Sequence, residues 1–281
     1  MIGFGPKEYF KEYDENGKLK TDNMGNGELN TNLDLKTKID LLRIMYNIKR
    51  IKTHGDIAGH LPFLYRIAST LKPNIIIHSG VRDGNSCAAF ALAQLENGGK
   101  LIDIDENKNS DEDLVKIRDN TENWTMEQTK VENEDLLMKL QEYKGSVDMW
   151  FSDTCHSYSG TMLELKEYSK LLSPKGIFFI HDMDPWTVYR EQSRAVDIWL
   201  KDNPEWKVKV QKGNNGIAVF YRDEFHLCGI KCDGHVGDEY PWGQDVEKII
   251  EELKILEEKG IATLLSKKAN GQLREIYKRQ K

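Results

Sequence analysis

Residues 75–86 read IIIHSGVRDGNS, a short apolar run followed by a bend that contains two glycines. Three consecutive isoleucines are typical of a strand buried on both faces, as in a parallel sheet. Gly80 and Gly84 let the backbone pass close to a ligand, because they lack a Cβ atom. Residues 85–96 then predict a helix whose first amides would face that ligand. A strand, a glycine bend and a helix in this order predict the start of a doubly wound α/β domain.

The alternation of strands and helices continues toward the C-terminus. Apolar runs predict strands at residues 100–104, 124–128, 147–151 and 177–180, and helical spacing predicts helices at 161–172 and 187–202. Ser-Pro-Lys-Gly at residues 173–176 is predicted to end the first of these helices. Two last strands, 206–211 and 217–221, flank an Asn-Gly turn typical of a hairpin. The pattern predicts an open parallel sheet with right-handed crossovers and a closing antiparallel strand.

Composition changes at both ends of this α/β region. Residues 1–34 are polar and rich in Asn and Gly, which indicates a flexible leader. Residues 35–51 and 56–70 have helical spacing, so the predicted central domain, residues 35–222, includes N-terminal helices. Residues 223–281 are predicted to be a loop and a helical appendage that packs on the domain or on a second subunit, giving a homo-oligomer. Within that loop, His226, Cys228, Cys232 and His235 are either a zinc site or a chance cluster.

Charge and hydropathy exclude several classes of protein. The chain has 281 residues, a formal net charge of −6, 39% hydrophobic and 31% charged residues. No block of Lys and Arg stands out, which argues against nucleic-acid binding. No apolar run approaches the ~20 residues that span a bilayer, and the N-terminus lacks the pattern of a signal peptide. Four cysteines are too few for a disulfide framework. We expect a soluble cytoplasmic protein without membrane partners.

A carboxylate follows the second predicted strand. Asp105 ends the segment LIDID, about twenty residues beyond Gly84. A carboxylate at that distance from a glycine bend can accept the hydroxyl protons of a ribose. The spacing G-x-x-x-G differs from the G-x-G-x-x-G that seats a pyrophosphate, so NAD and flavin dinucleotides are disfavoured. The sequence favours a nucleoside without phosphates, and the competing interpretation is a tight turn beside a solvated acid.

Titratable side chains follow the fourth and fifth predicted strands: Asp153 and His156 after one, His181, Asp182 and Asp184 after the other. Neighbouring strands end about 4.8 Å apart, so we expect these groups to converge above the sheet. In one interpretation Asp153, Asp182 and Asp184 bind Mg²⁺, which lowers the pKa of a substrate hydroxyl. In the other, His156 or His181 is a general base without a metal. The catalytic candidates are Asp153, His156 and His181.

Six segments in sequence order resemble the class I S-adenosylmethionine (SAM)-dependent methyltransferases. They are Asp56-Ile57 with His60-Leu61, IIIHSGVRDGNS, LIDID, FSDTCHSY, LLSPKGIFFIHDMD and NNGIAVFYR. Over residues 54–222 they are most similar to the small-molecule O-methyltransferase branch that includes macrocin O-methyltransferase and the cephalosporin hydroxylase-like proteins. The order and separation of the set carry the resemblance, since no single segment is decisive.

This resemblance implies a Rossmann-like, doubly wound sheet of seven strands with the last strand antiparallel. It implies that SAM is the cofactor, and that the small residues of the bend line its methionine and ribose parts while Asp105 holds the ribose. The predicted cofactor-binding residues are Gly80, Val81, Arg82, Gly84, Ser86, Asp105 and Asp153. Arg82 would bond either the carboxylate of SAM or a neighbouring acid. The implied reaction is methyl transfer to a hydroxyl of a small molecule, with sugars among the acceptors.

The chain departs from the family pattern at three places. The family usually has Glu at the position of His78, and Asp-Gly-Asp-His where this chain has Asp153-Thr154-Cys155-His156. Near the end of the third strand, Lys130 stands where Gly-Asp is usual. These departures motivate a second hypothesis, a degenerate SAM-fold protein that binds a nucleoside or a partner without catalysis.

Overall fold

The computed structural model describes residues 37, 40, 41, 44, 45, 57–107, 111–183, 189–211 and 215–222. Several predictions concern residues outside these ranges. They are the leader at 1–34, the appendage and its proposed oligomer contacts at 223–281, the cluster at 226–235, and Asp184. The domain boundaries at residues 34 and 222 therefore stay predictions.

The seven described strands form one sheet in the order β3-β2-β1-β4-β5-β7-β6. Their bounds are β1 Ile75–Ser79, β2 Lys100–Asp105, β3 Trp124–Gln128, β4 Val147–Ser152, β5 Leu172–His181, β6 Lys207–Gln211 and β7 Ile217–Tyr221. The first five strands pair in parallel, and β7 is antiparallel to both β5 and β6. The α/β class and the antiparallel last strand predicted from the sequence are confirmed.

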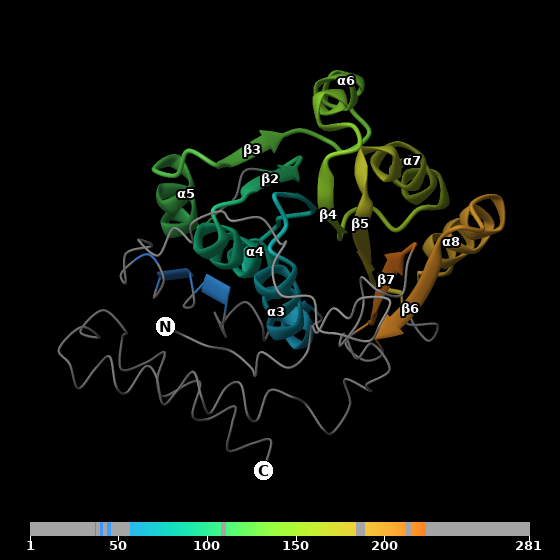
Figure 1. Ribbon diagram of the computed structural model, residues 1–281, viewed down its shortest axis with the longest axis horizontal. Helices are drawn as coiled ribbons and strands as arrows, with labels where there is room; N and C mark the ends of the chain where they lie inside the picture. The colour runs from blue at the N-terminus through green and yellow to red at the C-terminus, as the bar shows by residue number, and fades with distance from the viewer. Residues whose placement is uncertain are drawn as a thin grey trace, which may run out of the picture.

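Helices cover both faces of this sheet (Figure 1). The helices are α3 Leu61–Leu71, α4 Asn85–Asn97, α5 Glu112–Asp119, α6 Glu134–Leu140, α7 Tyr158–Tyr168 and α8 Arg190–Asp202, with 3₁₀ turns η2 Ile57–His60, η3 Gln141–Tyr143 and η4 Ser169–Leu171. Buried side chains of α3, α4 and α5 share one core cluster with the sheet, and those of α6, α7 and α8 share the other. The domain is a three-layer sandwich, because each face of the parallel sheet is apolar and requires a cover.

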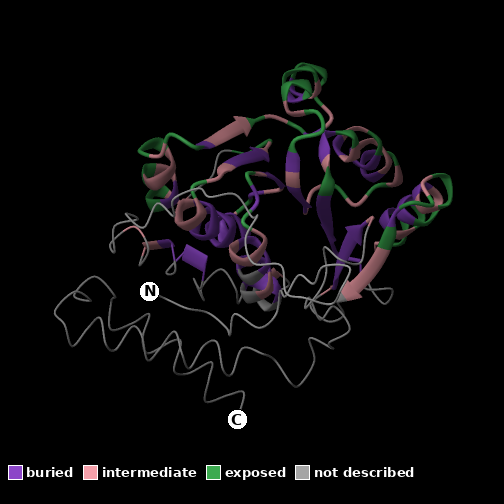
Figure 2. Cartoon of the chain, in the orientation of Figure 1, coloured by how far each residue is buried: buried purple, intermediate pink, exposed green. Residues whose placement is uncertain are grey.

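Burial follows this layering, with buried strands at the centre and exposed outer faces on the flanking helices (Figure 2). On the second face Phe178 stacks on Phe220 with ring centroids 4.1 Å apart. The described N-terminal residues Leu41, Ile44 and Met45 are helical and belong to the first core. None of the described helices has the length and apolar character needed to cross a membrane.

The structure corrects three sequence predictions. Helix α7 begins at Tyr158 rather than at residue 161, because Ser157 caps it by accepting a hydrogen bond from the Gly160 amide. Residues 173–176, predicted to end the helix at 161–172, belong to β5 as a bulge: Val147 pairs with Leu172, whereas Met149 pairs with Ile177. Helices α5 and α6 were not predicted, since they are only eight and seven residues long.

A buried carboxylate joins α7 to the end of β4. Glu164 accepts short hydrogen bonds from the hydroxyls of Ser152 and Thr154. Burial raises the pKa of Glu164 to about 7, although the two hydroxyls and His156 act in the opposite direction. The protonated carboxyl is therefore favoured in the folded protein well above the usual pKa of a glutamic acid.

Replacing Glu164 by Gln should remove a pH dependence of folding stability. With the folded pKa raised to about 7, the folded protein retains a proton that the unfolded chain has already released. The free energy of unfolding should therefore fall as the pH rises toward 7, and the variant should lose this part of the slope. Urea unfolding measured from about pH 5 to about pH 8 tests this. Glu167→Gln, on the same helix but partly exposed, should keep the slope; an unchanged slope in Glu164→Gln would contradict the prediction.

Candidate functional site

The end of β1 comes unusually close to the end of β4. A Cβ atom built on Gly80 would lie 1.9 Å from the carbonyl oxygen of Asp153, and Gly80 has a φ of +86°. Both facts exclude any other residue at this position without a shift of the backbone. The Asp153 amide also donates to the Ser79 carbonyl at 3.0 Å. The glycine bend and Asp153 are therefore held side by side at one edge of the sheet.

Asp105, at the end of β2, lies against the same bend. Its carboxylate accepts a hydrogen bond from the Arg82 amide at 2.7 Å, and a second from the Asn107 amide at 2.7 Å. Arg82 takes a left-handed conformation, with a φ of 46°, which aims its amide at Asp105. The structure thus brings together the bend and the carboxylate that were predicted to form a nucleoside cradle.

Two other residues of the predicted cofactor set are buried. Val81 is 2% exposed and Ser86 is 5% exposed. The hydroxyl of Ser86 lies 3.0 Å from Nε2 of His78, so it is engaged with the core beneath the bend. Gly84 has a φ of +88° and caps the N-terminus of α4. The roles of Gly80, Val81, Arg82, Gly84, Ser86, Asp105 and Asp153 in cofactor binding stay predictions.

The ends of β4 and β5 bring three titratable groups together. Nδ1 of His181 lies 3.4 Å from Oδ1 of Asp153 and 3.5 Å from Oδ1 of Asp182. His181 and Asp182 are buried, whereas the Asp153 side chain is 25% exposed. Asp182 has a φ of 61°, a conformation that Asp tolerates better than most residues do. This left-handed turn directly after β5 lets consecutive side chains face the same corner.

His156 reaches this corner from the loop after β4. Its Nε2 atom lies 2.6 Å from Oδ2 of Asp182, and its side chain is 28% exposed. The ring stacks on Tyr189 with a centroid distance of 3.9 Å and an angle of 19°. One carboxylate oxygen of Asp182 therefore orients a partly exposed imidazole, while the other faces His181. Asp182 therefore bears on both predicted interpretations of this corner: it bonds the candidate base His156, and it belongs to the predicted metal set.

The electrostatics of the corner depend on this pairing. Burial by itself raises the pKa of the Asp182 carboxyl, but His156 and His181 outweigh it and hold that pKa well below its usual range. Burial lowers the pKa of His181, but Asp153 and Asp182 reverse the effect and raise that pKa well above its usual value. The corner therefore favours ionised carboxylates beside an imidazolium.

The same corner fits a divalent cation in part. Asp153, His181 and Asp182 each offer a ligand atom, and these atoms lie within 4.8 Å of one another. The expected set was Asp153, Asp182 and Asp184; the structure places His181 with the first two, and Asp184 lies outside the described residues. A metal would bind here only to neutral His181, because its Nδ1 atom must be free of a proton to act as a ligand.

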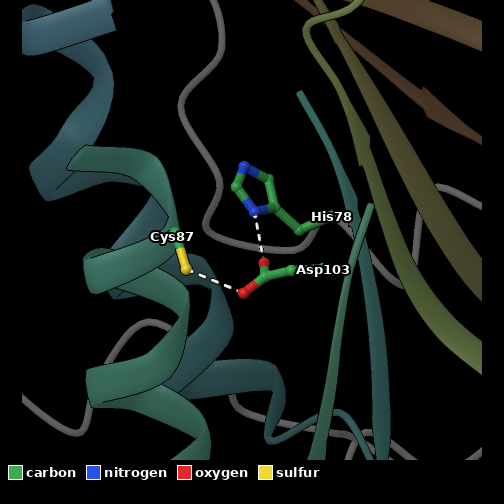
Figure 3. A group of neighbouring side chains, drawn as sticks. All are labelled: His78, Cys87 and Asp103. Atoms are coloured by element: carbon green, nitrogen blue, oxygen red, sulfur yellow. Dashed lines mark hydrogen bonds and ion pairs between the residues drawn. The ribbon is translucent and has the colours of Figure 1, made fainter. Parts of the chain in front are cut away.

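Sequence reasoning missed one cluster and one contact. The cluster is buried between β1, β2 and α4 and comprises His78, Cys87 and Asp103 (Figure 3). Asp103 stands in the middle of an apolar strand, and this interruption of the apolar pattern was the available signal. The contact is a hydrogen bond from Nε2 of Gln192 in α8 to the His181 carbonyl at 2.5 Å, which no local pattern reveals.

Comparison with known proteins agrees with this geometry. Residues 77–183 match a family model described as a methyltransferase domain, a segment that runs from β1 to the turn after β5. A search of curated proteins returned no match.

Several solved structures are similar to this chain. One is a Podospora anserina methyltransferase bound to S-adenosylhomocysteine (14% identity, 68% of this chain and 89% of that chain, TM-score 0.47). Another is an O-methyltransferase from Bacillus cereus with the same ligand (15%, 68% and 92%, TM-score 0.48). A third is the O-methyltransferase TomG from Streptomyces achromogenes with SAM (15%, 69% and 92%, TM-score 0.49).

The family match covers every strand end that carries the candidate site, from the glycine bend through Asp105 to Asp182. The sheet order and the antiparallel β7 agree with the architecture that the sequence resemblance implied. On these grounds residues 77–183 contain a methyltransferase domain, and the sheet around it has the Rossmann-like order that the sequence resemblance implied.

Proposed function

We propose that this protein transfers the methyl group of SAM to a hydroxyl of a small molecule. The observation that carries the proposal is the placement of Asp105 on the glycine bend, with the Arg82 amide at 2.7 Å. The carboxylate keeps lone pairs that can accept the ribose hydroxyls of an adenosine, and the bend offers backbone without a Cβ atom at Gly80. Sugars are among the proposed acceptors, as in the branch that the sequence resembles.

His156 supports the acid–base part of the proposal. Methyl transfer to oxygen needs an acceptor oxygen aligned with the sulfonium methyl and a group that takes its proton. With its Nε2–H donated to Asp182, the His156 ring keeps a lone pair on Nδ1 that can take this proton. When bound, SAM would supply the methyl group: the acceptor oxygen would bond to the methyl carbon as the carbon–sulfur bond breaks, giving S-adenosylhomocysteine and a methyl ether. Asp182 then stabilises the imidazolium.

A divalent cation held by Asp153, His181 and Asp182 is part of the proposal. Such an ion would lower the pKa of the acceptor hydroxyl and orient it. Its support is the convergence of three ligand atoms within 4.8 Å. The mixed oxygen and nitrogen set suits Mn²⁺ or another transition ion as well as Mg²⁺.

The rival hypothesis, a protein of this fold that binds a nucleoside or a partner without catalysis, predicts SAM binding without turnover. Release of S-adenosylhomocysteine in the presence of a panel of sugars and aromatic diols distinguishes the two. Turnover with any member excludes the rival, and SAM binding without turnover across the panel favours it.

Asp105→Asn should weaken SAM binding about ten- to a hundredfold, because a neutral amide accepts ribose hydroxyl protons less well than a carboxylate does. Isothermal titration calorimetry measures the change in Kd. Glu112→Gln removes one charge at an exposed position on α5 and should leave Kd unchanged. Equal affinity of Asp105→Asn and the wild type would overturn the ribose assignment, and no binding to the wild type at about 1 mM SAM would overturn the proposed function itself.

His156→Asn should lower kcat about a hundredfold or more, because proton transfer by a positioned side chain contributes on the order of 10²–10⁴. The same variant should bind SAM with the wild-type Kd, since the contacts of His156 are with Asp182 and Tyr189. Steady-state release of S-adenosylhomocysteine gives kcat, and calorimetry gives Kd. A variant with wild-type kcat would remove His156 from the mechanism.

Chelation tests the cation separately. Treatment with EDTA should lower turnover, and adding back Mg²⁺ or Mn²⁺ should restore it, because the ion shifts the acceptor hydroxyl toward its ionised form. Calorimetric titration of the SAM-free protein with Mn²⁺ should show one site that Asp153→Asn weakens. Unchanged turnover after EDTA, together with no Mn²⁺ binding, would show that the corner works as an imidazolium cluster without a metal.

A further inference from the structure

A fully buried carboxylate lies beneath the glycine bend. Asp103 is 0% exposed, and its two oxygens accept hydrogen bonds from three elements of the fold. Nδ1 of His78 on β1 lies 2.7 Å from Oδ1. Sγ of Cys87 on α4 donates to Oδ2 at 2.9 Å, and Nε1 of Trp124 on β3 donates to Oδ2 at 2.5 Å. In Figure 3 the carboxylate of Asp103 points toward α4, and dashed lines join it to Cys87 and His78.

The cluster of His78, Cys87 and Asp103 lies beneath the proposed cofactor-binding residues. His78 and Asp103 are register partners on β1 and β2. Gly80 directly follows β1, two residues beyond His78, and Asp105 is the last residue of β2, two residues beyond Asp103. Residues two apart on a strand point to the same face of the sheet, so the side chain of Asp105 lies on the same face of β2 as that of Asp103, which bonds Cys87 of α4.

Each of the first three residues of α4 is tethered by its side chain. Asn85 donates to the carbonyls of Ile44 and Met45, at 3.0 and 3.2 Å. Ser86 bonds the ring of His78, and Cys87 bonds Asp103. Two of the three tethers thus lead to the buried pair.

These tethers are demanding because the groups are buried. A buried ionised or polar group destabilises the folded protein when one of its hydrogen bonds is missing. This penalty is larger than the net stabilisation that the same hydrogen bond contributes when it is made. A small displacement of α4 would break the bonds to Ser86 and Cys87 together. The buried network therefore tolerates one placement of the first turn of α4.

We propose that His78 and Asp103 are positioning residues for the cofactor: through Ser86 and Cys87 they fix the first turn of α4, and with it the bend at Gly84. Gly84 caps this helix, and its carbonyl accepts from the Ala88 amide at 2.8 Å. A binding site whose residues are ordered before the ligand arrives binds it more tightly, because no further conformational entropy has to be lost on binding. The inference rests on the proposed SAM site and adds His78, Asp103 and Cys87 to the residues that determine its affinity.

The test variant is His78→Asn, whose shorter side chain cannot bridge Asp103 and Ser86. It should raise the Kd for SAM about tenfold, as expected for the loss of one buried hydrogen bond that holds the site. Ser86→Ala should do the same. In the double variant the two effects should not add, because both remove the same link. Additive effects would mean that Ser86 acts on the cofactor directly, and would overturn the relay.

Trp124→Phe is the matched control. It removes one hydrogen bond to the same carboxylate, from a side chain on β3 that is not part of the link from Asp103 through His78 to Ser86. It should lower the thermal midpoint while leaving the Kd for SAM within about twofold of the wild type. If Trp124→Phe weakens SAM binding as much as His78→Asn does, the network serves general stability, and the positioning role is wrong.

Amide hydrogen exchange gives a reading that does not need the cofactor. In the ligand-free protein, exchange at residues 85–89 should accelerate in Ser86→Ala and in any His78→Asn protein that folds, and should stay at the wild-type rate in Trp124→Phe. Unchanged exchange in Ser86→Ala would overturn the inference even if SAM binds. Accelerated exchange in a protein whose wild type binds no SAM would leave the structural relay standing and overturn the proposed function alone.

Discussion

The approach of the Gly80 backbone to the Asp153 carbonyl constrains the whole site. Because a Cβ atom at Gly80 would lie 1.9 Å from that oxygen, the residue after β1 must be glycine for Asp153 to follow β4 where it does. The glycine bend, Asp153 and the loop that carries His156 consequently lie at one edge of the sheet. Parallel pairing adds the ends of β2 and β5 to the same edge, which brings in Asp105 and the corner around Asp182.

Two kinds of polar group lie at this edge of the sheet, and they differ in how far they are buried. Asp105 and His156 are partly exposed. Asp103, His181 and Asp182 are buried and are stabilised by partners on other strands and helices. Asp182 orients His156, and we propose that the buried groups set the geometry of the site before a ligand arrives. This arrangement is consistent with the presence of His78 where the family usually has an acid, because its imidazole bridges the Asp103 carboxylate and the Ser86 hydroxyl.

Much of the fold could be predicted from the sequence because its signals are local. Three isoleucines, a glycine bend and a helix fixed the first βα unit, and the Asn-Gly turn indicated the antiparallel β7. The wrong predictions also concern single segments of the chain. Residues 173–176 have the composition of a loop, yet they bulge from β5 because tertiary pairing with β4 continues past them. Helices α5 and α6 were not predicted because eight and seven residues are too few to show a clear helical period.

The sequence alone determined the class of the domain and the strand ends at which its polar residues stand, since backbone propensity and apolar periodicity depend on neighbours along the chain. Only the tertiary structure decided which of these residues meet. The pairing of His156 with Asp182, the convergence of His181 and Asp182 with Asp153, and the convergence of His78, Cys87 and Trp124 on Asp103 all join residues far apart in sequence. Such contacts depend on strand register and on the depth at which each helix packs, and no local pattern encodes either quantity.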